Sequence, residues 1–140
     1  MAETRFDVLC IGNAIVDVLA RVEDSFLERH ALTKGMMRLI DEQIAEQLYS
    51  DMGPAIEISG GSAGNTAAGI ASFGGRAAYF GKVKKDQLGD VFAHDLRAQG
   101  VSFDSARATT GPATARSFIL VTPDGERTMN TYLGACVNLT

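Results

Sequence analysis

Apolar and polar residues follow two patterns along this chain, and the first pattern is that of β-strands. Residues 6–12 (FDVLCIG) form a short apolar run that ends in glycine, which predicts a buried strand. Residues 13–22 are rich in β-branched side chains and predict a second extended segment. Because strand side chains alternate with a period of two, we expect Asn13 and Asp17 on the same face of this segment.

The second pattern is the helical spacing of apolar residues, with capping residues at the ends. It predicts four helices, over residues 24–30, 41–51, 62–73 and 87–99. Asp24, Asp41 and Ser62 are the expected N-caps of the first three, because their side chains can accept hydrogen bonds from free backbone N–H groups. Gly100 is expected just after the end of the fourth helix.

The order of the expected elements indicates the fold class. Further strands are expected over residues 35–40, 56–59, 77–80 and 101–103. Their alternation with helices predicts parallel βαβ units. Near the end of the chain, two β-rich runs flank Pro123-Asp124-Gly125, which is a hairpin signal. We therefore expect an α/β fold in which an antiparallel piece is attached to a parallel sheet.

The length of 140 residues fits one domain or part of a larger one. A doubly wound sheet with so few core strands has a long unpaired edge. We therefore expect residues 1–140 to be the amino-terminal part of a larger domain, so that the fold is incomplete in this chain. The alternative is a small α+β domain that is complete as it stands.

Composition and charge exclude several classes of function. Hydrophobic residues make up 46% and charged residues 21%, which argues against disorder. A net charge of −4 argues against a nucleic-acid partner. No segment resembles a secretory leader or a membrane span, so we expect no membrane partner and a cytoplasmic location. Cys10 and Cys136 are too few for a disulfide framework, and no Cys or His pair has the spacing of zinc ligands, so no metal site is expected in this chain.

Residues 60–65 (GGSAGN) are the strongest local signal for a ligand. Adjacent glycines let a ligand approach the backbone, and their N–H groups come just before a helix N-terminus. The amide of Asn65, in the first helical turn, could reach the same ligand. The spacing matches neither the phosphate-binding P-loop nor the dinucleotide fingerprint. A tight strand-to-helix turn without a ligand is the alternative.

Asn13 and Asp17 are a second candidate pair. A carboxylate and an amide on one strand face could bind vicinal hydroxyls, because a carboxylate can accept two hydrogen bonds at once. The alternative is a solvent-facing strand with two polar residues. His30 and His94 fall on expected surface helices with no nucleophile arranged around them, so neither is expected to be catalytic.

Four motifs in order along the chain resemble the ribokinase/PfkB family and, within it, the adenosine kinases. They are residues 8–17 (VLCIGNAIVD), residues 60–67 (GGSAGNTA), the series Gly81, Asp86 and Gly89, and residues 124–127 (DGER) with Asn130. The resemblance covers essentially the whole chain. Each motif by itself is weak evidence. The resemblance to the family depends on their order and spacing along the chain.

The resemblance implies a Rossmann-like (ribokinase-like) α/β sandwich with a small β-sheet lid over the substrate. The lid would be formed by residues 14–22, 35–40 and 113–133. The hydroxyls of a ribose or another sugar would be held by Asn13, Asp17, Gly60, Gly61 and Asn65, with Ser62 beside them. In adenosine kinases the lid covers the purine, and the residues at those positions here are Met36, Met129 and Thr131. Methionine suits an adaptable apolar wall.

The resemblance also implies a reaction, the ATP-dependent phosphorylation of a primary hydroxyl. ATP and Mg²⁺ would be the cofactors, and a nucleoside or sugar would be the small-molecule partner. We expect adenosine, because a large apolar lid suits a nucleoside. A free sugar such as ribose or fructose is the alternative, and Lys84 and Arg38 depart from the pattern of many family members.

The catalytic base of the family is an aspartate in a glycine-rich motif of the type Asp-Thr-x-Gly-Ala-Gly-Asp. None of Asp17, Asp104 and Asp124 lies in a glycine-rich motif of this type. No catalytic residue is therefore expected in this chain, and the base, with most of the ATP site, is expected beyond Thr140. The isolated chain would then be inactive, and a non-catalytic nucleoside-binding fragment is a further alternative. The lid could also form a homodimer.

Overall fold

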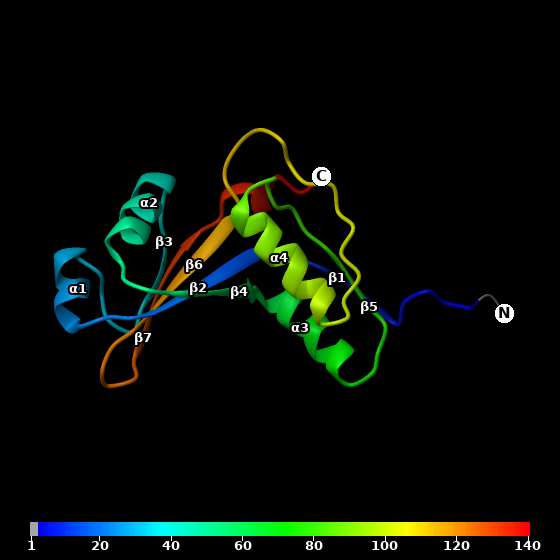
Figure 1. Cartoon of the computed structure of the whole chain (residues 1–140), viewed down its shortest axis with the longest axis horizontal. Helices are drawn as coiled ribbons and strands as arrows, with labels where there is room; N and C mark the ends of the chain where they lie inside the picture. Colours follow the sequence, from blue (N-terminus) through cyan, green and yellow to red (C-terminus); the bar gives the residue numbers. More distant parts are fainter. Residues whose placement is uncertain (1–2) are drawn as a thin grey trace.

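The computed structural model describes residues 3–140 and divides the strands between two sheets. The expected domain, residues 1–140, therefore includes two residues that lie outside the described range. Strands β1 (Val8–Ile11) and β5 (Ala77–Phe80) form a parallel pair. This pair lies toward one end of the molecule, and a five-stranded sheet extends toward the other (Figure 1).

The five-stranded sheet has the order β3-β7-β6-β2-β4. Its members are β2 (Ile15–Arg21), β3 (Met37–Leu39), β4 (Ile56–Gly60), β6 (Ala115–Val121) and β7 (Arg127–Tyr132). β2 is parallel to β6, and β3 is parallel to β7, whereas β6–β7 and β2–β4 are antiparallel. The sheet contains strands from all three segments expected in the lid. It also contains β4, which corresponds to the short extended segment expected over residues 56–59.

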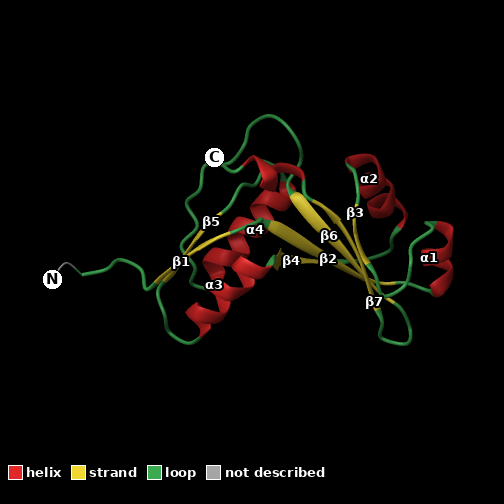
Figure 2. Cartoon of the chain, turned by 180° about the vertical axis from the view of Figure 1, so that it is seen from behind, coloured by secondary structure: helices red, strands yellow, loops and turns green. Residues whose placement is uncertain are grey.

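The four expected helices are confirmed. They are α1 (Asp24–Arg29), α2 (Glu42–Asp51), α3 (Ser62–Ser72) and α4 (Gln87–Ala98), and a 3-10 turn, η1 (Gly134–Asn138), follows β7. Helices α1 and α2 lie beside the five-stranded sheet, and α3 lies against the β1–β5 pair (Figure 2). Helix α4 lies against β4 and β2, and its Phe92 ring packs near the ring of Tyr79 of β5. None of the helices in residues 3–140 combines the length and the apolar content that crossing a bilayer requires.

The expected helix caps are partly wrong. Asp41 is the N-cap of α2, and its side chain accepts a hydrogen bond of 2.8 Å from the N–H of Ile44, as predicted. The cap of α1 is Glu23, because Asp24 already has helical geometry. The cap of α3 is Gly61 rather than Ser62, because the turn out of β4 requires a φ of +82° at the cap position, which glycine adopts without a steric clash.

The expected strand over residues 101–103 is also wrong. Ser102 forms an isolated parallel bridge with Ala78, and the chain then leaves the sheet after a single residue pair. Val101 and Phe103 are nevertheless buried, and the Phe103 ring lies 5.9 Å from the ring of Tyr79. The apolar pattern of this segment therefore reflects burial beside β5 rather than a regular strand.

The core of the five-stranded sheet lies on one face only. Along β2, Val16 and Val18 are buried, and Val18 is paired with the buried Phe118 of β6. Helix α2 covers this face, where the ring of Tyr49 lies 6.4 Å from the ring of Phe118. Asp17 alternates with these residues, so its side chain lies on the opposite face, away from α2.

Candidate functional site

The candidate site lies where the pairing of β2 with β4 ends and α3 begins. Gly60 is paired with Ile15, and a Cβ atom on Gly60 would lie 2.4 Å from Cγ of Asp17. A Cβ atom on Gly61 would lie 2.7 Å from the backbone oxygen of Asn13. Both distances are far below ordinary van der Waals contact. The two glycines are therefore required because the carboxylate of Asp17 and the backbone of Asn13 occupy the space that side chains would fill.

The first turn of α3 completes this arrangement. A Cβ atom on Gly12 would lie 2.6 Å from Cβ of Ala63, so the loop after β1 packs directly against the start of α3. The N-cap Gly61 offers no side chain to the free N–H groups of this turn. These groups carry the positive end of the helix dipole. Ser62 and Asn65 are exposed in the same turn and lie next to the glycines.

The carboxylate of Asp17 is half-buried, and burial raises its pKa above the ordinary value of 3.8. None of the side-chain hydrogen bonds among residues 3–140 involves its oxygens. A partly desolvated carboxylate without a protein donor is costly to the fold. It is also ready to accept hydrogen bonds from two hydroxyls of a ligand.

Asp17→Asn is expected to raise the thermal unfolding midpoint of the chain at pH 7. The raised pKa means that, at pH values between 3.8 and the folded-state pKa, the folded state binds more protons than the unfolded state. Stability therefore falls as pH rises through this range, and the loss is fully present at pH 7. Asparagine, which carries no charge, removes this loss. Thermal melts of both proteins at pH 3 and pH 7 test the prediction, because the difference should vanish at pH 3; an equal difference at both values would contradict it.

The face that bears Asp17 continues across three more strands. Asp17 is paired with Ser117 on β6, Ser117 with Thr131 on β7, and Thr131 with Leu39 on β3. The hydroxyls of Ser117 and Thr131 are 2.8 Å apart. Paired residues point to the same side of a sheet, so a short polar row starts at Asp17 and crosses the sheet.

Apolar side chains border this polar row. Met129 of β7 is paired with Met37 of β3 and with Ile119 of β6, two residues from the polar row on each strand. Of the residues expected over a purine, Met129 and Thr131 therefore lie on the same face as Asp17. Ser117 has no local sequence signal that marks it as a site residue, because its position opposite Asp17 depends on a strand pairing between residues that are 100 positions apart.

Met36 lies elsewhere. It precedes β3 and lines a cavity of 140 Å³ with Met37, Arg38 and Asn130, where Nε of Arg38 donates a hydrogen bond of 2.9 Å to Oδ1 of Asn130. Asn130 is paired with Phe118, on the face that α2 covers. The structure therefore does not bring Met36 together with Asp17, and Met37 is the methionine of β3 that shares the Asp17 face.

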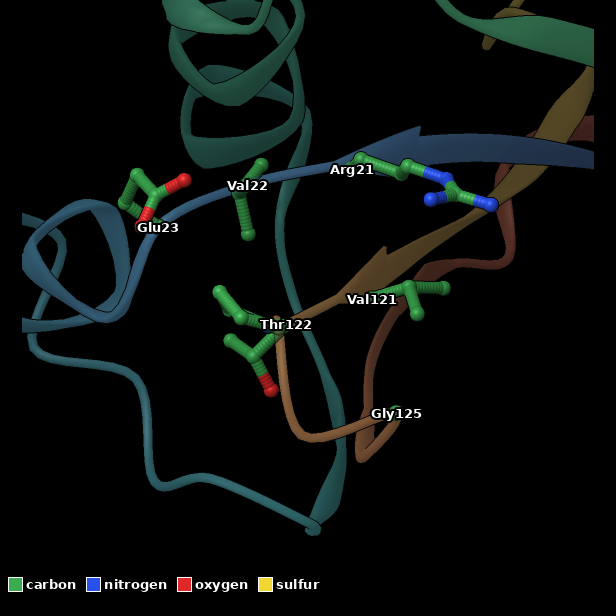
Figure 3. Close-up of a pocket in the computed structure, with 7 residues that line it drawn as sticks. Arg21, Val22, Glu23, Val121, Thr122 and Gly125 are labelled. Atoms are coloured by element: carbon green, nitrogen blue, oxygen red, sulfur yellow. The ribbon is translucent and has the colours of Figure 1, made fainter.

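A separate pocket of 530 Å³ lies at the far end of the five-stranded sheet. Arg21, Val22 and Glu23 line it from the end of β2, and Val121, Thr122 and Gly125 line it from the hairpin (Figure 3). Arg21 is four residues beyond Asp17, or about 13 Å along an extended strand. None of the residues expected to bind substrate lines this pocket. We therefore keep the candidate site at Asp17, where the predicted residues converge.

The candidate site offers acceptors for hydroxyls rather than ligands for a metal. Within residues 3–140, no group of three or more His, Cys, Asp and Glu side chains is arranged to hold a metal ion. The site residues that converge are Asn13, Asp17, Gly60 and Gly61, with Ser62 and Asn65 in the adjacent turn. This donor set fits a neutral polyhydroxyl compound better than Mg²⁺, which prefers several oxygen ligands including carboxylates.

The two sheets, the helices beside the parallel pair and the glycine turn against Asp17 define a ribokinase-like α/β protein. The sequence model of the family described as "pfkB family carbohydrate kinase" matches residues 53–140. The chain belongs to this family.

Solved structures and curated proteins agree with that assignment. The adenosine kinase from Sinorhizobium meliloti is 66% identical over 97% of this chain, with a TM-score of 0.87. A probable sugar kinase from Rhizobium etli CFN 42 is 64% identical over 98% of the chain, with a TM-score of 0.88. This chain spans 42% of each of these structures. The probable fructokinase-4 of Arabidopsis thaliana is 39% identical over 77 residues, which are 55% of this chain and 24% of that protein.

Proposed function

We propose that the protein containing this chain transfers the γ-phosphoryl group of ATP to a primary hydroxyl of a nucleoside, with adenosine as the preferred substrate, and that this chain binds the nucleoside. The observation that carries the proposal is the carboxylate of Asp17, which lies against Gly60 and receives no hydrogen bond from residues 3–140. A carboxylate in this state is suited to the two vicinal hydroxyls of a ribose.

The proposed role of this chain is positioning. Phosphoryl transfer depends mostly on holding the acceptor hydroxyl in line with the phosphate and on stabilising charge. Asp17 and Asn13 would hold the sugar, while the backbone of Gly60 and Gly61 and the amide of Asn65 would close around it. ATP supplies the phosphoryl group, and Mg²⁺ offsets its negative charge. Within residues 3–140, no group of side chains is arranged to hold that ion. The role that we propose for this chain is to position the acceptor, and no proton transfer is assigned to it.

Adenosine is proposed ahead of a free sugar because of the sheet face beyond Asp17. Met37, Leu39 and Met129 lie on this face, and Met37 and Leu39 are 56% and 62% exposed, so they provide an apolar surface that suits the base of a nucleoside. The hydroxyls of Ser117 and Thr131 lie beside it and could recognise polar atoms of a base. The similarity to an adenosine kinase over 97% of the chain supports the same choice. The similarity to fructokinases favours fructose as the second candidate.

The test is ADP release by the longest protein that the gene encodes, with Mg-ATP and either adenosine, other nucleosides, ribose or fructose. We expect turnover with adenosine and little with the free sugars. Turnover with fructose or ribose alone would support the site assignment but would show that the substrate is a sugar rather than a nucleoside. No turnover from a folded protein would reduce the proposal to nucleoside binding, which calorimetric titration of the 140-residue chain with adenosine measures directly.

A further inference from the structure

Strand β3 carries part of the apolar surface proposed for the nucleoside base, yet little in the fold retains it. It has three residues, all of them exposed, and it pairs with β7 at the edge of the sheet. Between the buried side chains of Leu32 and Ile40, none of residues 33–39 is buried. A short exposed edge strand separates easily, because few backbone hydrogen bonds and no buried side chains hold it. The place of Met37 on the Asp17 face therefore depends on polar contacts of this segment.

Lys34, which precedes β3, makes such contacts with two other segments. Its ammonium nitrogen lies 2.7 Å from Oδ1 of Asp24, the first residue of α1, and 2.5 Å from Oδ2 of Asp124, in the hairpin between β6 and β7. Oδ1 of Asp124 also orders that hairpin, because it accepts hydrogen bonds from the Thr122 hydroxyl at 2.7 Å and from the Glu126 N–H at 3.1 Å. One cation therefore joins α1, the segment before β3 and the turn before β7. We call Lys34, Asp24 and Asp124 the Lys34 bridge.

Charge keeps the Lys34 bridge closed. The hydrogen bond from Lys34 lowers the pKa of Asp124 to about 2, and the hydrogen bonds to Asp124 and Asp24 raise the pKa of Lys34. Lys34 and Asp124 therefore both stay ionised at neutral pH. A single exposed ion pair contributes little, but a cation between two carboxylates also offsets their mutual repulsion. Loss of the cation would leave two like charges close together beside the start of β3.

The residues that follow the Lys34 bridge lead directly into the strand pairing. The N–H of Gly35 donates a hydrogen bond of 3.0 Å to Oγ1 of Thr128, and the N–H of Met129 donates one of 3.0 Å to the backbone oxygen of Met36. Both bonds join the segment before β3 to β7. The pairing of Met37 with Met129, on the face proposed for the base, comes immediately after them.

We propose that Lys34 is a positioning residue for the nucleoside. By joining Asp24 to Asp124 it keeps β3 paired with β7, and β3 in turn presents Met37 to the base. This inference rests on the proposed function and adds to it a residue that does not touch the substrate. Because the acceptor hydroxyl is aligned through Asp17 rather than through β3, loss of the Lys34 bridge should weaken substrate binding and spare turnover.

The test is Lys34→Met in the longest protein that the gene encodes, with saturating Mg-ATP and varied adenosine. Methionine keeps an unbranched side chain and removes the charge. We expect KM for adenosine to rise about threefold to tenfold and kcat to stay within about twofold. Amide hydrogens of residues 35–40 should exchange faster. Added NaCl should raise the wild-type KM toward that of the variant, because salt screens the Lys34 bridge, and should change the KM of the variant little.

Two matched variants control for general damage. Lys34→Arg keeps a cation that can bind two carboxylates and should keep KM within about twofold of the wild type. Lys85→Met removes the charge of an exposed lysine in the loop between β5 and α4, and should leave KM and hydrogen exchange unchanged.

Three results would overturn the proposal: a wild-type KM in Lys34→Met, a fall in kcat as large as the rise in KM, or a KM in Lys34→Arg as high as in Lys34→Met. Hydrogen exchange separates this failure from failure of the proposed function. Faster exchange of residues 35–40 in Lys34→Met, with no adenosine turnover by the wild type, would support the Lys34 bridge and count against the nucleoside kinase function.

Discussion

Asp17→Ala is expected to lower kcat/KM for adenosine by about a hundredfold to a thousandfold in the longest protein that the gene encodes. Each hydrogen bond from a ligand hydroxyl to a carboxylate is worth about 1.5–3 kcal/mol, and the expected loss corresponds to about 2.7–4 kcal/mol of transition-state stabilisation. Among residues 3–140, no donor competes for the oxygens of this carboxylate. Its removal should therefore affect the ligand rather than an internal network.

The effect should appear in both kinetic constants. KM should rise because the ribose loses its acceptor, and kcat should fall because the hydroxyl to be phosphorylated is less well aligned. Asp104→Ala is a suitable control, since the Asp104 side chain is exposed and lies 3.9 Å from Arg97, away from the glycine turn. It should leave both constants unchanged. Normal turnover and affinity in Asp17→Ala would show that the site assignment is wrong.

The elements of this fold that depend on short-range signals could be predicted from the sequence. The cap at Asp41, the hairpin turn at Asp124 and Gly125 and the alternation along β2 each depend on a few neighbouring residues. Backbone sterics and side-chain hydrogen bonds of these residues act locally. The alternation along β2 places the side chain of Asp17 on the opposite face from Val16, whereas Asn13, which was expected on the same strand face as Asp17, precedes the strand, since β2 begins at Ile15.

Strand pairing could not be predicted in the same way. Whether Met36 or Met37 faces the site depends on the register of β3 with β7, and a shift of one residue exchanges the two faces. The inclusion of β4 in the five-stranded sheet likewise depends on its antiparallel pairing with β2. These pairings join segments that are far apart along the chain. No local pattern in either segment specifies them.

The glycine turn also combines a feature that the local sequence predicts with one that depends on the fold. The pair Gly60-Gly61 predicts that something approaches the backbone closely, and the sequence suggests a ligand. In the structure, the groups that approach are Asp17 and the backbone of Asn13. The glycines would therefore act on the proposed ligand through these residues as well as through their own N–H groups. This distinction leads to different expectations for the two glycines.

Gly60→Ala is expected to reduce kcat/KM about a hundredfold while the fold survives. The added Cβ would lie 2.4–2.5 Å from the carboxylate atoms of Asp17, which can rotate away. The stability cost should therefore stay near 1 kcal/mol or below, but the displaced carboxylate no longer meets the ribose. Gly61→Ala should differ, because its Cβ meets the backbone of Asn13 at a φ of +82°. Backbone cannot rotate away, so a stability loss of about 2 kcal/mol or more is expected.

A double-mutant cycle separates the proposed mechanism from general damage. If Gly60 acts by giving room to the Asp17 carboxylate, Gly60→Ala should have little further effect on kcat/KM in a chain that already carries Asp17→Ala. Denaturant unfolding of the wild type, the two single variants and the double variant should show only small changes in the free energy of unfolding. If the fold loss of kcat/KM in the double variant equals the product of the losses in the two single variants, this view is contradicted. The backbone of Gly60 would then contact the substrate independently of Asp17. Such a result would move the closest contact from the strand β2 to the turn that starts α3.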